Sequence, residues 1–266
     1  ITCRDWSSDV CSSDLVAFSL SALDGTDAGL VGLTKVLRVR DANATIAETR
    51  KIIDLGKTMF VDPKIIDALN HLVYKPQAET IGDIHVDHLL IDMTGLPEVS
   101  PDDQAQIRKA LGDDGLLFRI APVGSEHVVV TFGGGAKRFS RVAELVARNQ
   151  APLAEVPAFA KAAAKLPARK NSEIYIDGDN TWKLVQAVAT LTQNNLPVTL
   201  SPINAPIAVG GAVQGQASRV DIFIPLEVIA AVKDMVMQIM MAGMAAPGGP
   251  AGGPATAPTS APSPTF

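Results

Sequence analysis

The sequence is 266 residues long and 47% apolar, and its 23 basic and 28 acidic side chains give a formal net charge of −5. This apolar fraction is typical of a folded chain with a real core, and the mildly acidic balance excludes the basic surface that nucleic-acid-binding proteins need. The longest apolar stretch, residues 226–244, carries Lys233 and Asp234 at its centre, so no membrane span is predicted.

Residues 1–15, ITCRDWSSDVCSSDL, resemble the translation of a sequencing-adapter oligonucleotide rather than native protein. This resemblance implies that the native sequence begins near Val16 and that residues before it are missing. Both cysteines, Cys3 and Cys11, lie in the segment, so the remainder is expected to have no thiol and no disulfide. Any signal peptide or lipid anchor would have preceded Val16.

The rest of the sequence repeats one pattern about four times, in which two strands joined by a short turn are followed by a helix. The predicted strand pairs are residues 16–22 with 30–40, 75–81 with 84–93, 116–122 with 126–132, and 205–213 with 217–224. The helices after them are residues 41–55, 100–111, 136–148 and 226–244, and further predicted elements are a strand at 173–177, a helix at 181–193 and short helical stretches at 63–72 and 156–166. Asp41 and Ser100 stand where helix N-caps are expected. Short turns favour antiparallel hairpins, so we expect an α+β fold with a mostly antiparallel sheet and the helices on one face.

Three regions are expected along the chain: the adapter-like residues 1–15, an α+β body at 16–245, and a tail at 246–266. The body is either one unit or two subdomains divided near residues 150–170. The tail is rich in Pro, Ala and Gly and cannot bury enough apolar surface to offset its ordering entropy, so it is predicted to be disordered.

A glycine-rich turn, Gly133-Gly134-Gly135, joins an apolar strand to the helix that carries Lys137. Such turns can present backbone amides to a phosphate. The spacing matches neither a phosphate-binding P-loop nor the dinucleotide fingerprint. A plain tight turn is therefore the favoured interpretation, with an anion site as the alternative.

Residues 174–181, IYIDGDNT, resemble the first motif of the haloacid-dehalogenase phosphatases. The resemblance implies that Asp177 would be the nucleophile and Asp179 the acid or base, and residues 198–201 resemble the second motif. The later acidic pair that holds magnesium in that family has no match, and without it phosphoryl transfer lacks its metal. A helix cap at Asp177 or Asp179 is favoured, while the enzyme alternative requires Asp177, Asp179 and Lys137 to converge in one pocket.

The histidine-containing segment His85, Asp87 and His88 lies in one predicted strand. Strand alternation places His85 and Asp87 on one face and His88 on the other, so the three cannot bind one metal from a straight strand. No recognisable metal spacing involves the other histidines. We predict no metal and no cofactor.

Five of the seven methionines fall on the last helix. Helical periodicity predicts that one face packs on the sheet; its residues are Val228, Ile229, Val232, Val236, Ile239 and Met240. A second stripe is a candidate interaction surface, formed by Leu226, Met237, Met241 and Met244. Core burial, a peptide-binding groove and copper(I) binding are the alternatives for these methionines.

The hairpin-helix succession, the apolar last helix and the Pro/Ala/Gly tail resemble the uncharacterised exported proteins of environmental bacteria. This resemblance implies a periplasmic or cell-envelope location. We therefore expect a non-enzymatic binding or scaffold protein that presents an apolar surface to another protein, a lipid or a second copy of the chain. The alternative is a phosphatase-like enzyme that uses Asp177 and Asp179.

Overall fold

The computed structural model describes residues 15–26, 29–60, 62–93, 99–148, 155–168, 172–191, 202–214 and 217–245. The adapter-like segment, except Leu15, lies outside these residues, as do residues 198–201 and the tail. Within the described part, the chain forms an α+β fold in which neighbouring strands are antiparallel, as the sequence predicts.

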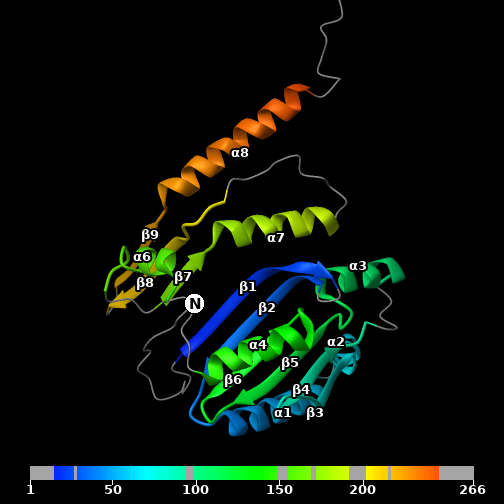
Figure 1. Ribbon diagram of the computed structural model, residues 1–266. Helices are drawn as coiled ribbons and strands as arrows, with labels where there is room; N and C mark the ends of the chain where they lie inside the picture. Colours follow the sequence, from blue (N-terminus) through cyan, green and yellow to red (C-terminus); the bar gives the residue numbers. More distant parts are fainter. Residues whose placement is uncertain are drawn as a thin grey trace, which may run out of the picture.

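A six-stranded antiparallel sheet, which we call sheet A, forms the larger part of the molecule (Figure 1). Its strands are β1 (Leu15–Thr26), β2 (Gly29–Arg38), β3 (Leu72–Ile81), β4 (Ile84–Ile91), β5 (Leu117–Val123) and β6 (His127–Phe132). The order across the sheet is β1-β2-β6-β5-β4-β3. The first three predicted hairpins are confirmed, and β2 joins the first hairpin to the third by pairing with β6.

The helices connected with sheet A begin at the predicted caps. They are α1 (Ala42–Met59), α2 (Pro63–Asn70), α3 (Pro101–Leu111) and α4 (Gly135–Ala147). The Asp41 carboxylate accepts the Ala44 amide at 2.9 Å, and Ser100 forms a reciprocal capping box with Asp103. These bonds satisfy amide groups that have no partner inside the helix, which is why the helices start at these residues.

The sequence predicts that the helices share one face of the sheet. The structure differs, because α1 and α4 lie on opposite faces of sheet A. Phe139 of α4 packs with Ala121 and Val129, whereas Ile46 of α1 packs with the alternate residues Ile120 and Val128. Adjacent residues of β5 and β6 are buried on both sides, so each face of these central strands needs a covering helix. The one-face prediction is therefore wrong in this respect.

A second antiparallel sheet, which we call sheet B, has three strands in the order β7-β8-β9. The elements of this region are α6 (Pro157–Ala163), β7 (Ser172–Ile176), α7 (Gly178–Leu191), β8 (Ile207–Gln214), β9 (Ala217–Phe223) and α8 (Leu226–Ala245). One face of sheet B is covered, since Ala162 and Leu166 pack against Ala208. The predicted strand at 173–177 thus pairs within this second sheet rather than with sheet A.

The two regions meet where α7 runs beside β1 (Figure 1). The Asn180 side chain accepts a hydrogen bond from the Ala22 amide and donates one to the Leu20 carbonyl, both at 3.1 Å. One amide side chain thereby satisfies a donor and an acceptor of the outermost strand of sheet A, as a neighbouring strand would.

Candidate functional site

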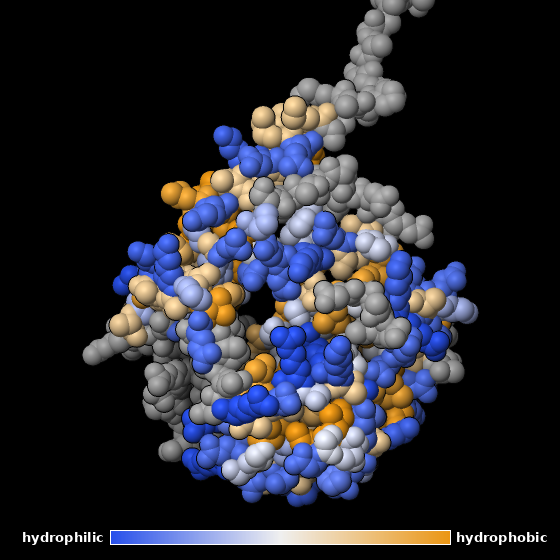
Figure 2. Space-filling model, viewed as in Figure 1, coloured by the Kyte–Doolittle hydropathy of each residue, from blue (hydrophilic) through white to orange (hydrophobic). Residues whose placement is uncertain are grey.

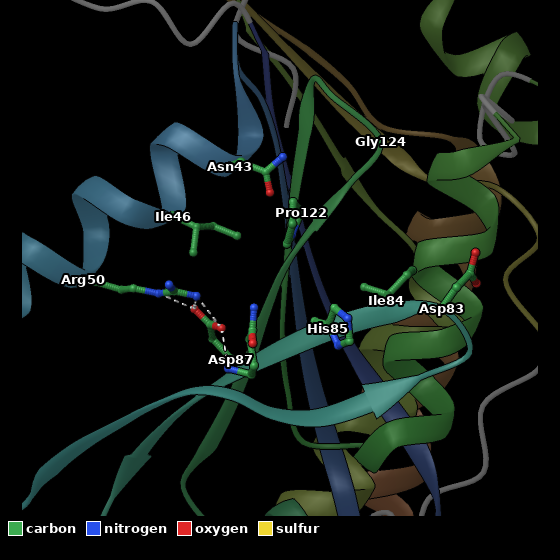
Figure 3. A pocket seen from close by; sticks show the side chains of 10 residues that line it. Asn43, Ile46, Arg50, Asp83, Ile84, His85, Asp87, Pro122 and Gly124 are labelled. Carbon is green, nitrogen blue, oxygen red and sulfur yellow. Dashed lines mark hydrogen bonds and ion pairs between the residues drawn. The ribbon is translucent and has the colours of Figure 1, made fainter.

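A polar cavity of about 480 Å³ opens on the α1 face of sheet A (Figure 3). It lies between α1, the β3–β4 hairpin and the β5–β6 turn. Its lining residues are Asn43, Ile46, Arg50, Gln77, Asp83, Ile84, His85, Asp87, Pro122 and Gly124. Arg50, Ile46 and Asn43 reach it from one helix because they are spaced by three or four residues.

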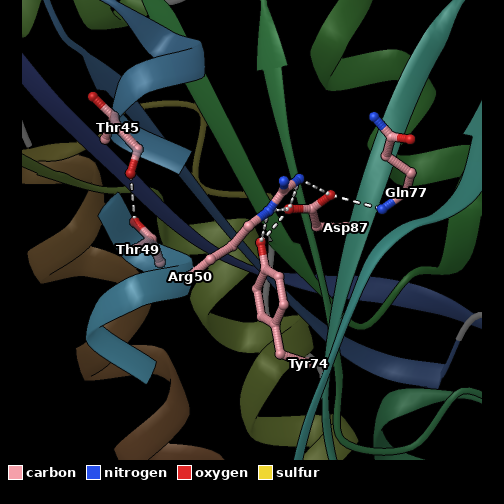
Figure 4. Close-up of polar contacts among 6 residues, drawn as sticks. All are labelled: Thr45, Thr49, Arg50, Tyr74, Gln77 and Asp87. Atoms are coloured by element: carbon pink, nitrogen blue, oxygen red, sulfur yellow. Dashed lines mark hydrogen bonds and ion pairs between the residues drawn. The ribbon is translucent and has the colours of Figure 1, made fainter. Parts of the chain in front are cut away.

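Asp87 is the central group of this cavity and is only 2% exposed. Arg50 donates from Nε to Oδ2 at 3.0 Å and from Nη2 to both carboxylate oxygens at 2.8 Å (Figure 4). The Tyr74 hydroxyl donates to Oδ2, and the Gln77 amide donates to Oδ1 at 2.8 Å. A carboxylate buried this deeply is tolerated because charged and neutral donors surround both oxygens.

The Gln77 amide reaches Asp87 because β3 is interrupted at this point. The register between β3 and β4 shifts between Lys75 and Glu79, and Gln77 has a φ of 49°. A positive φ in a non-glycine residue is strained, and a bulge of this kind redirects a backbone group away from the strand ladder. Because of the bulge, the Gln77 amide donates to the buried Asp87 carboxylate instead of to a neighbouring strand.

The contacts around Asp87 define what the cluster can do chemically. Burial and the hydrogen bond to Asp87 raise the pKa of Tyr74 to about 12, while hydrogen bonds to Tyr74 and Asp87 raise the pKa of Arg50. Tyr74 is therefore a neutral donor at ordinary pH, and the acceptor positions of Asp87 are occupied. The cluster fastens α1 to the sheet, and no oxygen of Asp87 is free to act as a general base.

A second ion-pair network lies on the opposite face of the same strands. Arg119 donates to Glu79 at 2.7 Å and to Asp114 at 2.8 Å, and His88 bonds Glu79 at 2.9 Å. Bonds from His88 and Arg119 lower the pKa of Glu79 although burial opposes them. His88 and Asp87 therefore point to opposite faces, as strand alternation predicts. Among the described residues, no group of three or more His, Cys, Asp or Glu side chains could hold a metal ion.

The glycine-rich turn packs tightly against sheet A and against its own helix. A Cβ at Gly133 would lie 2.3 Å from the Val31 carbonyl oxygen, and one at Gly134 would lie 2.6 Å from Arg138 Cδ. The Arg138 guanidinium donates to Thr34 Oγ1 at 3.1 Å, and burial lowers its pKa. The Arg138 side chain fills the space that Gly32 and Gly134 leave above this turn. The sequence pattern gave no reason to single out Arg138.

Asp177 and Asp179 occupy the corner between β7 and α7, where both bond nearby backbone amides. Asp177 accepts the Asn180 amide at 2.9 Å, and Asp179 accepts the Ile203 amide at 2.7 Å. Lys137 is an exposed residue of α4, on sheet A. Within the described residues, no hydrogen bond or ion pair joins Lys137 to either carboxylate. The corner has the capping role that the sequence analysis favours.

An apolar surface on α8 is the second candidate site. The candidate stripe from the sequence is exposed, with Leu226 at 78% and Met241 at 65%, and Met237 is also exposed. The side chain of Met244 lies outside the described residues. Figure 2 shows apolar side chains on this helix, which extends away from the sheets. Its first two turns pack on the body, where Val228 and Ala231 contact Ile203.

The structure contradicts the predicted packing face of α8. Val228 is buried as expected, but Ile229, Val232, Val236, Ile239 and Met240 are exposed. The prediction assumes that a helix lies along its sheet, whereas α8 contacts the body at its beginning and then projects from it (Figure 1). Periodicity identifies an apolar arc correctly but gives no information on the direction of the helix.

The uncovered face of sheet B adjoins this helix. Ile174, Ile222 and Val220 point to the face opposite α6, and Val220 is 67% exposed. On the other side of the sheet, an apolar groove of about 500 Å³ lies between α6, the end of β9 and the start of α8, lined in part by Ala162, Phe223 and Leu226. The first turns of α8 pack against Ile207 on the uncovered face, so this face and the exposed side of α8 adjoin; we call their exposed apolar side chains together the apolar surface.

Comparisons with protein-family models, with curated proteins and with solved structures gave no match for this chain. No helix in the described part of the chain is long and apolar enough to cross a membrane.

Proposed function

We propose that this protein is a non-enzymatic binding or scaffold protein whose working surface is the apolar surface of sheet B and α8. The observation that carries the proposal is the exposure of α8, a helix of 20 residues that is apolar on nearly every side. A helix of this kind is ordinarily buried, and large exposed apolar regions mark interaction sites. A location in the cell envelope remains a prediction from the sequence pattern.

The polar clusters support the same proposal by contrast. Asp87, Asp177 and Asp179 each accept hydrogen bonds from protein groups that fix their position. A catalytic carboxylate needs an acceptor position directed at a substrate. The side chains of the apolar surface, in contrast, lack the apolar neighbours that their chemistry favours.

The test replaces two exposed methionines of α8 by lysine, Met237→Lys with Met241→Lys. Sedimentation of the full chain measures self-association, and flotation with phosphatidylcholine vesicles measures lipid binding. We expect the parent to show at least one of these interactions and the variant to lose it. The matched control is Glu227→Lys with Asp234→Lys, which adds more positive charge to the same helix without altering an apolar residue.

Two results would contradict the proposal. One is a parent chain that sediments as a monomer and does not float with vesicles. The other is a methionine variant that binds as well as the parent while melting at the same temperature, because the exposed stripe would then contribute nothing to binding.

A further inference from the structure

In the part of the chain that the structure describes, β9 is an edge strand of sheet B. Among the described residues, β9 pairs with β8 alone, over the whole length from Ala217 to Phe223. It contains no proline, and its pairing with β8 shows no bulge. An open, regular edge of this kind is a ready template for another strand.

The charges of β9 are arranged symmetrically about Val220. Arg219 and Asp221 flank it and form an ion pair of 2.6 Å with each other, and the Arg219 side chain is largely exposed. Two copies of β9 in antiparallel pairing about a two-fold axis at Val220 would place each Arg219 opposite the Asp221 of the other copy. A two-fold contact requires this kind of self-complementarity.

The registers adjacent to this one are unfavourable. A two-fold axis at Arg219 or at Asp221 would bring identical charges directly opposite each other, which is destabilising. A shift by one residue would join the open apolar face of one sheet to the α6-covered face of the other, because side chains alternate along a strand. The register centred on Val220 avoids both defects and pairs Val220 with its own copy on the apolar face.

We infer that a second copy of this chain binds beside the apolar surface, through β9, and that the two copies form a continuous six-stranded antiparallel sheet. This inference goes beyond the proposed function, because the pairing extends the apolar surface rather than covering it. The pairing satisfies the open edge of β9 and extends the apolar face of sheet B across the two-fold axis. Cross-strand Arg219–Asp221 pairs fix the register.

Charge reversal tests the pairing directly. The parent should sediment at twice the chain mass of 27.9 kDa. Arg219→Asp and Asp221→Arg should each raise the dimer dissociation constant by about tenfold or more, because both cross-strand pairs become like-charge pairs. The double variant Arg219→Asp with Asp221→Arg should dimerise like the parent, since exchanging the two charges restores every pair. An equimolar mixture of the two single variants should form heterodimers.

The outcomes separate this inference from the proposed function. A monomeric parent, single variants that dimerise as tightly as the parent, or a mixture that stays monomeric would each overturn the β9 pairing. If self-association or vesicle binding is nevertheless lost in Met237→Lys with Met241→Lys, the proposed function stands without it. Should a single variant fail to fold, the double variant still reports on the pairing, because it retains both charges.

Discussion

Sheet A and sheet B are built from the same hairpin-and-helix unit, yet they are completed to different extents. The central strands of sheet A are covered by α4 on one face and α1 on the other, and its buried ionic groups are paired. Sheet B is covered by α6 on one face, while Val220 and Ile222 are exposed on the other. The same local pattern thus yields a closed core in one region and an open surface in the other, and the open one is where binding is expected.

The largest expected effect comes from placing a charge in each region. Val129→Asp should unfold the protein, because Val129 is fully buried in sheet A and an unpaired carboxylate there costs several kcal/mol against a total stability of roughly 5–15 kcal/mol. The matched change Val236→Asp lies on α8, where the side chain is 46% exposed, and should cost less than about 1 kcal/mol. Urea unfolding measures both. Equal losses would show that α8 belongs to the core.

Asp87→Asn should destabilise sheet A by about 2 kcal/mol. The change leaves Arg50 without its counter-ion, and the cost falls below that of a fully buried pair because Arg50 is partly exposed. Glu126→Gln is the control, since it removes an exposed carboxylate that also pairs with an arginine and should cost less than about 0.5 kcal/mol. If thermal and urea unfolding do not distinguish the two variants, the Asp87 cluster does not hold α1 in place.

Asn180→Ala tests the contact between the two regions. Losing both hydrogen bonds to β1 should cost about 1–2 kcal/mol, and the Ala22 amide should exchange faster with solvent. Thr190→Ala on the same helix removes a hydroxyl that bonds only within α7 and serves as the control. Unchanged exchange at Ala22 would mean that α7 does not dock on sheet A in solution.

The two tyrosines of the chain report separately on the two sheets. Tyr74 lies in sheet A, with its pKa raised to about 12, and Tyr175 lies in sheet B, where burial and the Glu173 carboxylate also raise the pKa. The folded state therefore holds both protons more tightly than the unfolded chain does. The stabilisation from Tyr74 is complete below pH 10 and is lost between about pH 10 and 12.

Phenolate absorbance measures the pKa of each tyrosine separately. Tyr74 alone titrates in Tyr175→Phe, and Tyr175 alone titrates in Tyr74→Phe. We expect a midpoint near pH 12 for Tyr74. A midpoint near 10, the ordinary value for tyrosine, would argue against its burial beside Asp87.

The smallest expected effect is that of Asp177→Asn. Asparagine can also accept the Asn180 amide, so stability should change by less than about 0.5 kcal/mol. Parent and variant are compared in a phosphatase assay with magnesium, and neither should show metal-dependent turnover. Activity in the parent that disappears in the variant would restore the phosphatase alternative.

The sequence predicted the local elements well because their signals are local. Ser100 and Asp41 cap helices as expected, and short turns at Gly82 and Gly124 close hairpins. The sequence contains no comparable local signal for the separation into two sheets, because strand pairing depends on contacts between residues distant in sequence. The run Val128-Val129-Val130 did contain the information that both faces are covered, since consecutive apolar residues indicate a strand buried on two sides.

The polar cavity could not be predicted in the same way. Asp87 was singled out for its neighbouring histidines, whereas its partners Arg50, Tyr74 and Gln77 come from α1 and β3. No spacing rule joins residues that meet through folding alone. On α8 helical periodicity placed Leu226, Met237 and Met241 on an outward stripe, but the direction of the helix depends on where Val228 packs.

Asn180 has a consequence for how assemblies of this chain could grow. Its side chain occupies backbone groups on the outer edge of β1, while Pro76 and the bulge interrupt β3 at the other edge of sheet A. Devices of this kind stop further strands from adding to a sheet. Pairing through β9 would occupy that edge in both copies, so further growth by strand addition would be left to β7, the other edge strand of sheet B, and not to sheet A.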